Sequence, residues 1–148
     1  MFDKNLHKLT NYLKSNHLTI ATAESCTGGL LSSRLTDVSG SSEFVKLNFV
    51  TYAYEAKEQA IGVSHSTLVN HSAVSYECAK EMAEGLQKTT GCDLALCTTG
   101  IAGPTGGSKE KPVGTVFVGV SSDWYEEVRE LHVGGGHADR AYVRWVSA

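Results

Sequence analysis

The residues best suited to chemistry in this sequence lie in the stretch Thr22–Gly29, which reads Thr-Ala-Glu-Ser-Cys-Thr-Gly-Gly. An apolar, β-prone run at Leu18–Ala21 leads into it, and an apolar helical pattern begins at Leu30. A strand that turns directly into a helix would place the Ser25 hydroxyl near helix N–H groups that lack intrahelical partners. That geometry suits a nucleophile beside an oxyanion site. An ordinary helix cap with a tight turn uses the same residue types, so both interpretations stay open here.

A second pair of reactive side chains, Tyr52 and Lys57, lies at the next predicted strand-to-helix junction. The residues before Tyr52 alternate as in a strand, and a helical pattern starts at Glu55. Tyr52 therefore closes the predicted strand, and Lys57 lies on the first turn of the predicted helix. Successive junctions of this kind can bring a serine, a tyrosine and a lysine together at one end of a sheet. Taken alone, a helix lysine is usually solvated and a strand tyrosine usually packs in a core.

A glycine-rich loop, Thr98–Gly107, leaves a third predicted strand and is followed by Lys111–Val116. Loops of this composition allow backbone N–H groups to approach a phosphate. The loop lacks the Gly-Lys-Ser/Thr sequence of the P-loop (Walker A motif) that binds nucleoside triphosphates. A purely structural turn remains the alternative interpretation.

These three segments, in this order and spacing, resemble the C-terminal domain of the CinA (competence/damage-inducible) proteins. That domain also occurs alone as nicotinamide mononucleotide amidase. The resemblance runs from about residue 5 to the end of the chain. It is carried by five motifs: Ala23–Gly29, Val50–Tyr52 with Glu55–Lys57, Gly100–Pro104 with Gly106-Gly107, Lys111–Val116, and Asp139-Arg140 with Val143-Arg144.

The resemblance implies that Ser25, Tyr52 and Lys57 form a catalytic group that hydrolyses the carboxamide of nicotinamide mononucleotide. The products would be nicotinate mononucleotide and ammonia, formed through an acyl-enzyme without a metal or cofactor. Ser25 is the expected nucleophile. Lys57 is the expected base, which requires a pKa well below the usual value of about 10.4. Tyr52 would relay the proton or align the other two, and the sequence does not decide whether Tyr52 or Lys57 takes the serine proton.

Seven further residues are expected to bind the substrate. The backbone N–H groups of the turn after Ser25 are candidates for an oxyanion hole, the glycine-rich loop could cradle the ligand, and Arg140 is the best side chain for the phosphate. Lys111 is a weaker candidate for the same anion, and Asp139 could equally be a helix N-terminal charge. The seven are Thr27, Gly28, Gly29, Gly100, Gly103, Thr105 and Arg140.

Three features complicate this assignment. Cys26 is a rival nucleophile, but neighbouring side chains on an extended chain point to opposite faces, so we do not expect both to reach one site, and the resemblance favours Ser25. The family usually has asparagine at the position of Tyr54, which puts any contact of that amide in doubt. The family's last helix usually continues beyond the position of Ala148.

Composition narrows the class of protein. The net charge of −3 and the lack of a basic cluster argue against nucleic-acid binding. No apolar run has the length of a membrane span, and the first residues lack a signal-peptide core. The four cysteines have no CxxC spacing and the six histidines have no metal-binding spacing. We therefore expect a cytoplasmic protein with reduced thiols, no metal, and no nucleic-acid or membrane partner.

Periodicity predicts one three-layer α/β/α domain over residues 1–148, with a mixed, mostly parallel sheet of about five strands. Strands are expected over 18–23, 44–52, 93–98, 114–121 and 126–133, and the last two form a hairpin. Helices are expected over 3–17, 28–37, 56–61, 67–71, 75–89 and 138–146.

Two alternatives to the nucleotide amidase stay open. The chain could be a non-catalytic CinA-like binding or interaction module, or an amidase for another pyridine or nucleoside amide. The resemblance also implies a homodimer or higher homo-oligomer. The last helix carries Tyr142, Trp145 and Val146 on one apolar face, which must be covered by this chain's own sheet or by another subunit.

Overall fold

A computed structural model describes residues 4–136 and 139–148 and contains one five-stranded mixed sheet. The strand order is β2-β1-β3-β4-β5. β1 is parallel to both β2 and β3, whereas β3–β4 and β4–β5 are antiparallel pairs, so only β4 runs against the other four. The strands are β1 (Ile20–Glu24), β2 (Val45–Val50), β3 (Leu94–Gly100), β4 (Thr115–Ser121) and β5 (Glu126–His132). This confirms the predicted mixed, mostly parallel sheet.

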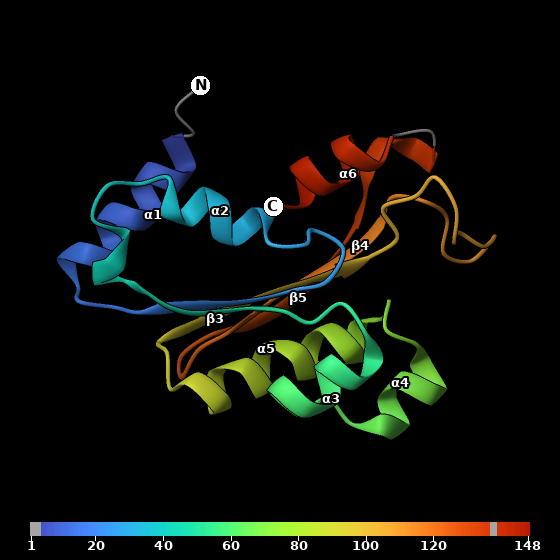
Figure 1. The fold of residues 1–148 in the computed structure, drawn as a ribbon, viewed down its shortest axis with the longest axis horizontal. Coiled ribbons are helices and arrows are strands. Elements are labelled where there is room, and N and C mark those ends of the chain that lie inside the picture. The colour runs from blue at the N-terminus through green and yellow to red at the C-terminus, as the bar shows by residue number, and fades with distance from the viewer. Residues whose placement is uncertain (1–3, 137–138) are drawn as a thin grey trace.

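Helices cover both faces of the sheet, as expected for a three-layer domain (Figure 1). One face carries α1 (Lys4–Ser15), α2 (Leu30–Thr36) and α6 (Arg140–Ser147). The other carries α3 (Tyr54–Ile61), α4 (His65–His71) and α5 (Tyr76–Thr90). Two short 3-10 segments, η1 (Ser41–Glu43) and η2 (Val133–Gly136), complete the description. In the described part, no helix is long and apolar enough to cross a membrane.

Apolar residues on each face of the sheet form the core. The α5 side buries a cluster that includes Met82 and Leu86 of that helix and Ala95 of β3. Another cluster lies under α1 and α2 and includes Leu13 and Phe44. A small third cluster lies under α6 and consists of Cys26, Ala102, Val116, Val133 and Val143. The third cluster matters most for the site, because it joins the residue after Ser25 to the last helix.

Most predicted elements are present, with small shifts at their ends. Both ends of α5 are capped: the Ser75 hydroxyl accepts a hydrogen bond from the Cys78 amide at 3.1 Å, and Gly91 ends the helix with a φ of 65°. β2 ends at Val50, so Tyr52 lies in the loop before α3 and not in the strand. Asp139 caps α6 through the Tyr142 amide, whereas Ala138 lies outside the described residues.

The apolar face expected on the last helix is not the face that packs on the sheet. Val143 and Ser147 are buried, while Tyr142, Trp145 and Val146 are about half exposed. The helix therefore uses a narrow stripe of small side chains for its inner contact. Trp145 stacks instead against the Arg34 guanidinium of α2, 5.0 Å from the ring centre.

Candidate functional site

The chain segments that carry the reactive side chains leave one edge of the sheet. Residue pairing places Glu24, the last residue of β1, between Val50 of β2 and Thr98 of β3. The segment after each strand is then held to its neighbour, because the Ser25 amide donates to the Thr98 carbonyl and the Thr51 amide donates to the Glu24 carbonyl. The carboxyl ends of parallel strands are where α/β proteins commonly bind ligands.

Ser25 and Lys57 meet at this edge. The Lys57 Nζ lies 3.1 Å from the Ser25 Oγ, within hydrogen-bonding distance. It also lies 2.7 Å from the Thr51 carbonyl oxygen and 3.4 Å from that of Tyr52. Lys57 is fully buried and Ser25 is 9% exposed. The structure therefore brings together two of the three predicted catalytic side chains, and holds the amine with backbone carbonyls from the loop before its own helix.

Burial lowers the pKa of the Lys57 amine, since the charged form loses its hydration inside the protein. Within the described residues no carboxylate forms an ion pair with Lys57 to oppose this effect. A buried lysine without a carboxylate partner is the environment in which a lysine can serve as a base.

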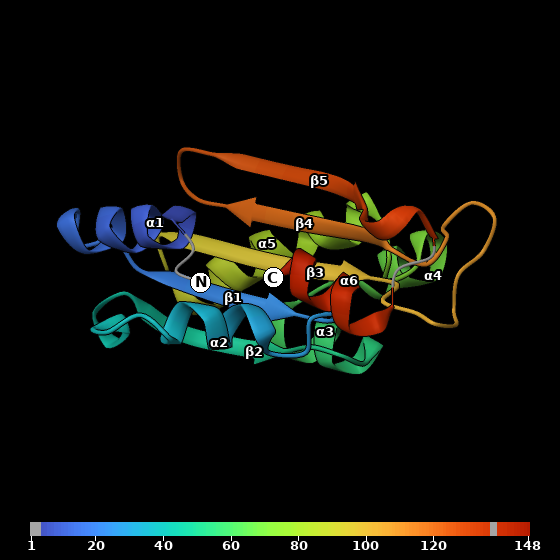
Figure 2. The same ribbon diagram turned by 90° about the horizontal axis from the view of Figure 1, so that it is seen from above.

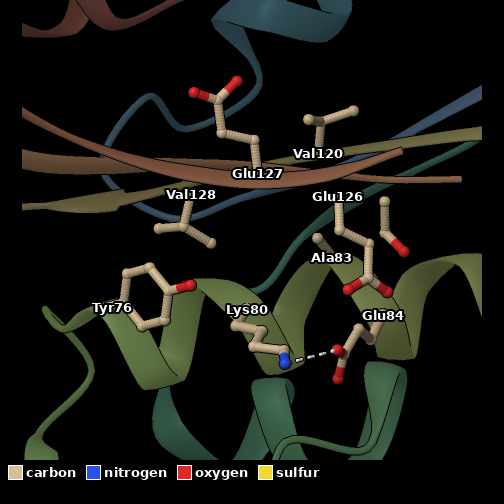
Figure 3. Close-up of a pocket in the computed structure, with 9 residues that line it drawn as sticks. Tyr76, Lys80, Ala83, Glu84, Val120, Glu126, Glu127 and Val128 are labelled. Carbon is tan, nitrogen blue, oxygen red and sulfur yellow. Dashed lines mark ion pairs between the residues drawn. The ribbon is translucent and has the colours of Figure 1, made fainter.

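Lys80 of α5 shows the opposite environment. It is exposed and its Nζ lies 3.4 Å from Glu84, which raises the pKa of the Lys80 amine mainly through their hydrogen bond. Figure 3 shows this pair in a pocket between α5 and the strands β4 and β5. A second pocket adjoins the first and shares Glu84, Ser121 and Glu126 with it. Neither pocket is lined by Ser25, Tyr52 or Lys57. Lys80 is thus an ordinary surface lysine. The lysine suited to act as a base is Lys57, at the edge of the sheet that carries Ser25.

The phenol of Tyr52 lies away from the Ser25–Lys57 pair in this structure. Its hydroxyl accepts a hydrogen bond from the Arg140 guanidinium at 2.7 Å, and the side chain is 58% exposed. Arg140 also donates to the Gly103 carbonyl at 2.8 Å. Arg140 therefore joins Tyr52 to Gly103, another predicted substrate-binding residue. No hydrogen bond links the Tyr52 hydroxyl to Ser25 or Lys57 in the described part.

The helix N–H groups that were expected to be free are mostly occupied. The Glu24 carboxylate is fully buried and accepts from the amides of Gly29, Leu31 and Ser32 at the start of α2. The Gly28 amide donates to the Ser25 carbonyl at 3.1 Å. Of the three amides proposed for an oxyanion hole, only that of Thr27 has no hydrogen-bond partner among the described residues. Sequence reasoning missed Glu24, although the residue lies inside the quoted motif.

We expect Glu24→Gln to destabilise the fold. The carboxylate also accepts from the hydroxyls of Thr27 and Ser32 at 2.6 Å each, so every contact is an N–H or O–H donor. In glutamine an NH₂ group would replace one carboxylate oxygen, so a donor would face the donors that this oxygen now accepts from. The remaining oxygen would carry no charge, so its hydrogen bonds would be weaker. The free energy of unfolding should fall by at least about 2 kcal/mol, measured by urea denaturation.

The control for this change is Glu110→Gln on the exposed loop between β3 and β4, which should alter stability by less than about 0.5 kcal/mol. Equal stability of the Glu24→Gln variant and the wild type would contradict the assigned role of Glu24 as the cap of α2.

The remaining predicted residues have clearer structural roles. Gly100 is packed so tightly that an added Cβ would lie within 2.8 Å of the Thr115 carbonyl and of the Val116 backbone. Lys111 donates to the His71 carbonyl and the Ser72 hydroxyl, each at 3.1 Å, so it ties the long loop to the end of α4. Thr105 is exposed on that loop. Tyr54 begins α3, and its hydroxyl accepts from the Ala73 amide.

Cys26, the rival nucleophile, is poorly placed for reaction. It is 4% exposed and belongs to the cluster under α6. Burial is the main cause that raises the pKa of its thiol to about 11. Since the thiolate is the reactive form, a thiol in this environment is inert near neutral pH. In the described residues no group of His, Cys, Asp and Glu side chains is arranged to hold a metal ion.

Comparison with known families matches residues 3–148 to the CinA C-terminal domain. The chain belongs to this family. A CinA-like protein of Chlorobium chlorochromatii is 58% identical over 103 residues, which are 70% of this chain and 24% of that protein. A Thermoanaerobacter sp. (strain X514) protein named for competence-damage induction is 52% identical over 132 residues, or 89% of this chain and 31% of that one. The chain thus spans about a third or less of the length of these curated relatives.

Solved CinA structures share the fold over nearly the whole chain. A CinA superfamily protein of Escherichia coli gives a TM-score of 0.90 at 30% identity, covering 99% of this chain and 87% of that one. A competence/damage-inducible protein of Agrobacterium tumefaciens gives 0.89 at 36% identity, covering 99% and 90%. The five-stranded α/β fold described above is therefore that of the CinA superfamily.

Proposed function

We propose that this CinA domain is a cytoplasmic amidase that hydrolyses the carboxamide of nicotinamide mononucleotide to nicotinate mononucleotide and ammonia. The observation that supports this proposal best is the contact of 3.1 Å between the Ser25 Oγ and a buried lysine amine. Amide cleavage needs a nucleophile and a proton shuttle, and these two groups supply both.

The two carbonyls beside Lys57 favour this amine as the base. A neutral amine has two N–H bonds and one lone pair. Donation to the carbonyls of Thr51 and Tyr52 would occupy both N–H bonds and leave the lone pair for the Ser25 hydroxyl. Tyr52 would then assist through its backbone, while its hydroxyl positions Arg140. This favours Lys57 over Tyr52 as the proton acceptor.

The reaction would proceed in two stages. The Ser25 Oγ attacks the carboxamide carbon while Lys57 takes its proton, and the ammonium of Lys57 then protonates the departing amine, so that ammonia leaves and a Ser25 ester remains. Water attacks this ester, gives one proton to Lys57, and the acid is released as Ser25 regains its proton. The unpartnered Thr27 amide is the candidate oxyanion donor. Arg140 is the candidate phosphate ligand, together with the loop at Gly103 and Thr105.

The test is ammonia release from a panel of amides. The protein is incubated with nicotinamide mononucleotide, nicotinamide riboside, free nicotinamide and an aliphatic amide, and ammonia and the acid are measured. Release that is fastest from the mononucleotide supports the proposal. Faster release from another amide would favour the broader amidase, and no release from any would favour a non-catalytic binding module.

We also propose a homodimer. Tyr142, Trp145 and Val146 of α6 are 52%, 57% and 46% exposed, so this chain's own sheet does not cover them. A second subunit would remove this apolar surface from water. Sedimentation at micromolar concentration should give the mass of a dimer, and Tyr142→Glu should shift it toward the monomer. A wild type that sediments only as a monomer at this concentration would contradict the proposal.

A further inference from the structure

Arg144 of α6 contacts the turn that carries Ser25. Its Nη2 and Nε donate to the Thr27 carbonyl at 2.9 and 3.3 Å. The same helix buries Val143 in the cluster that contains Cys26. In the view from above, α6 lies over the end of the sheet where β1 finishes (Figure 2). The last helix therefore touches the two residues that follow the proposed nucleophile, by packing at Cys26 and by hydrogen bonding at Thr27.

A single peptide group, between Thr27 and Gly28, connects Arg144 to Ser25 through hydrogen bonds. Arg144 binds the carbonyl of the Thr27–Gly28 peptide, and the N–H of that peptide donates to the Ser25 carbonyl at 3.1 Å. A cation at one end of a peptide group strengthens the hydrogen bond at the other, because it polarises the group. Glu24 fixes the other side of the turn through the Gly29 amide.

The backbone at Gly28 is suited to this close approach. Its φ is +61°, a conformation that side chains disfavour, and an added Cβ would lie 3.3 Å from the Arg144 Nη2. The guanidinium therefore fills the space beside the turn. Both ends of the peptide group are held: the Thr27 carbonyl accepts from Arg144 and, at 3.3 Å, from the Leu30 amide, and the Gly28 N–H donates to the Ser25 carbonyl.

We propose that Arg144 is a positioning residue, which holds the Thr27–Gly28 peptide so that the Ser25 hydroxyl stays aligned with Lys57. This inference rests on the proposed hydrolase function. Loss of Arg144 should loosen the turn without removing any group that touches the substrate. Since a displacement of about 1 Å can cost roughly 100-fold in rate, kcat should fall by roughly 10- to 100-fold while KM changes little.

The experiment compares Arg144→Ala with Arg34→Ala. Arg34 is a matched control, because it also donates to a backbone carbonyl across the α2–α6 contact, that of Trp145 at 3.4 Å, but does not reach the turn. Arg144→Lys keeps the positive charge and can still donate a hydrogen bond to the Thr27 carbonyl, so it should recover part of kcat. It replaces Arg144→Ala in the comparison if the alanine variant folds poorly. Steady-state kinetics with nicotinamide mononucleotide separate kcat from KM.

Amide hydrogen exchange supplies a readout that does not depend on activity. Exchange over residues 25–32 should speed up about tenfold or more in Arg144→Ala and stay unchanged in Arg34→Ala. Unchanged exchange in Arg144→Ala would overturn the proposal, and so would a raised KM with normal kcat, which would make Arg144 a substrate ligand. If the wild type releases no ammonia while exchange still responds to Arg144, the proposed function fails and the role in the turn is structural only.

Discussion

Ser25→Ala should lower ammonia release from nicotinamide mononucleotide by about four powers of ten or more. The Ser25 hydroxyl is the only nucleophile proposed to form the acyl-enzyme, and removal of such a group leaves only binding and electrostatic effects. The fold should persist, because Ser25 holds the turn through its backbone amide and carbonyl, which alanine retains. The measurement is single-turnover ammonia release, with circular dichroism to verify folding.

Cys26→Ala is the matched control for this change. Its thiol is buried and its pKa is raised to about 11, so it should contribute nothing to the chemical step. The variant should keep activity within roughly threefold, although loss of packing under α6 will cost about 1 kcal/mol of stability. If Ser25→Ala keeps near-native turnover and Cys26→Ala loses it, the assignment of the nucleophile is wrong.

Lys57→Arg should be nearly inactive, with a loss of about 1,000-fold or more, even though it preserves a positive charge. Arginine stays protonated in proteins and cannot accept the Ser25 proton. General-base catalysis contributes about 100- to 10,000-fold, and the longer side chain would also displace Ser25. Lys80→Arg on α5 is the control, since Lys80 is exposed and paired with Glu84, and it should retain full activity.

The pH dependence of the wild type tests the same assignment. Only the neutral amine accepts a proton, so kcat/KM should rise as the pH increases through the pKa of Lys57. Burial lowers this pKa, so the rise should occur at a pH well below about 10.4, which is the pKa of a free lysine. A profile without any such rise, or a fully active Lys57→Arg enzyme, would exclude Lys57 as the base.

The lowered pKa of Lys57 also predicts how the free energy of unfolding depends on pH. Between the lowered pKa of the folded state and the ordinary value, the unfolded chain binds a proton at Lys57 that the folded chain does not. The free energy of unfolding should therefore rise with pH across that window as far as Lys57 contributes. This trend should disappear in Lys57→Met, which gives a readout that is independent of substrate.

The helices and strands and their order could be predicted from the sequence. The alternation of apolar runs with Gly, Ser and Asp residues located the five strands and six α-helices of the described residues to within a few residues. The resemblance to the CinA family, carried by sequence motifs, pointed to Ser25 and Lys57, which the fold brings into contact. The helices and strands depend on local backbone preferences and side-chain periodicity, which neighbouring residues encode.

The environment of each reactive group could not be predicted from the sequence, because it depends on how distant segments pack together. Burial of Lys57 depends on α3, α5 and the sheet packing around one amine, which no local pattern specifies. Lys80 on α5, by contrast, is exposed and its amine has a raised pKa. Glu24 was likewise assigned no role from the sequence, yet its carboxylate accepts hydrogen bonds from the helix N–H groups that were expected to be free. Contacts such as Arg144 to Thr27 join residues 117 positions apart, and they exist only once the sheet has brought both ends of the chain together.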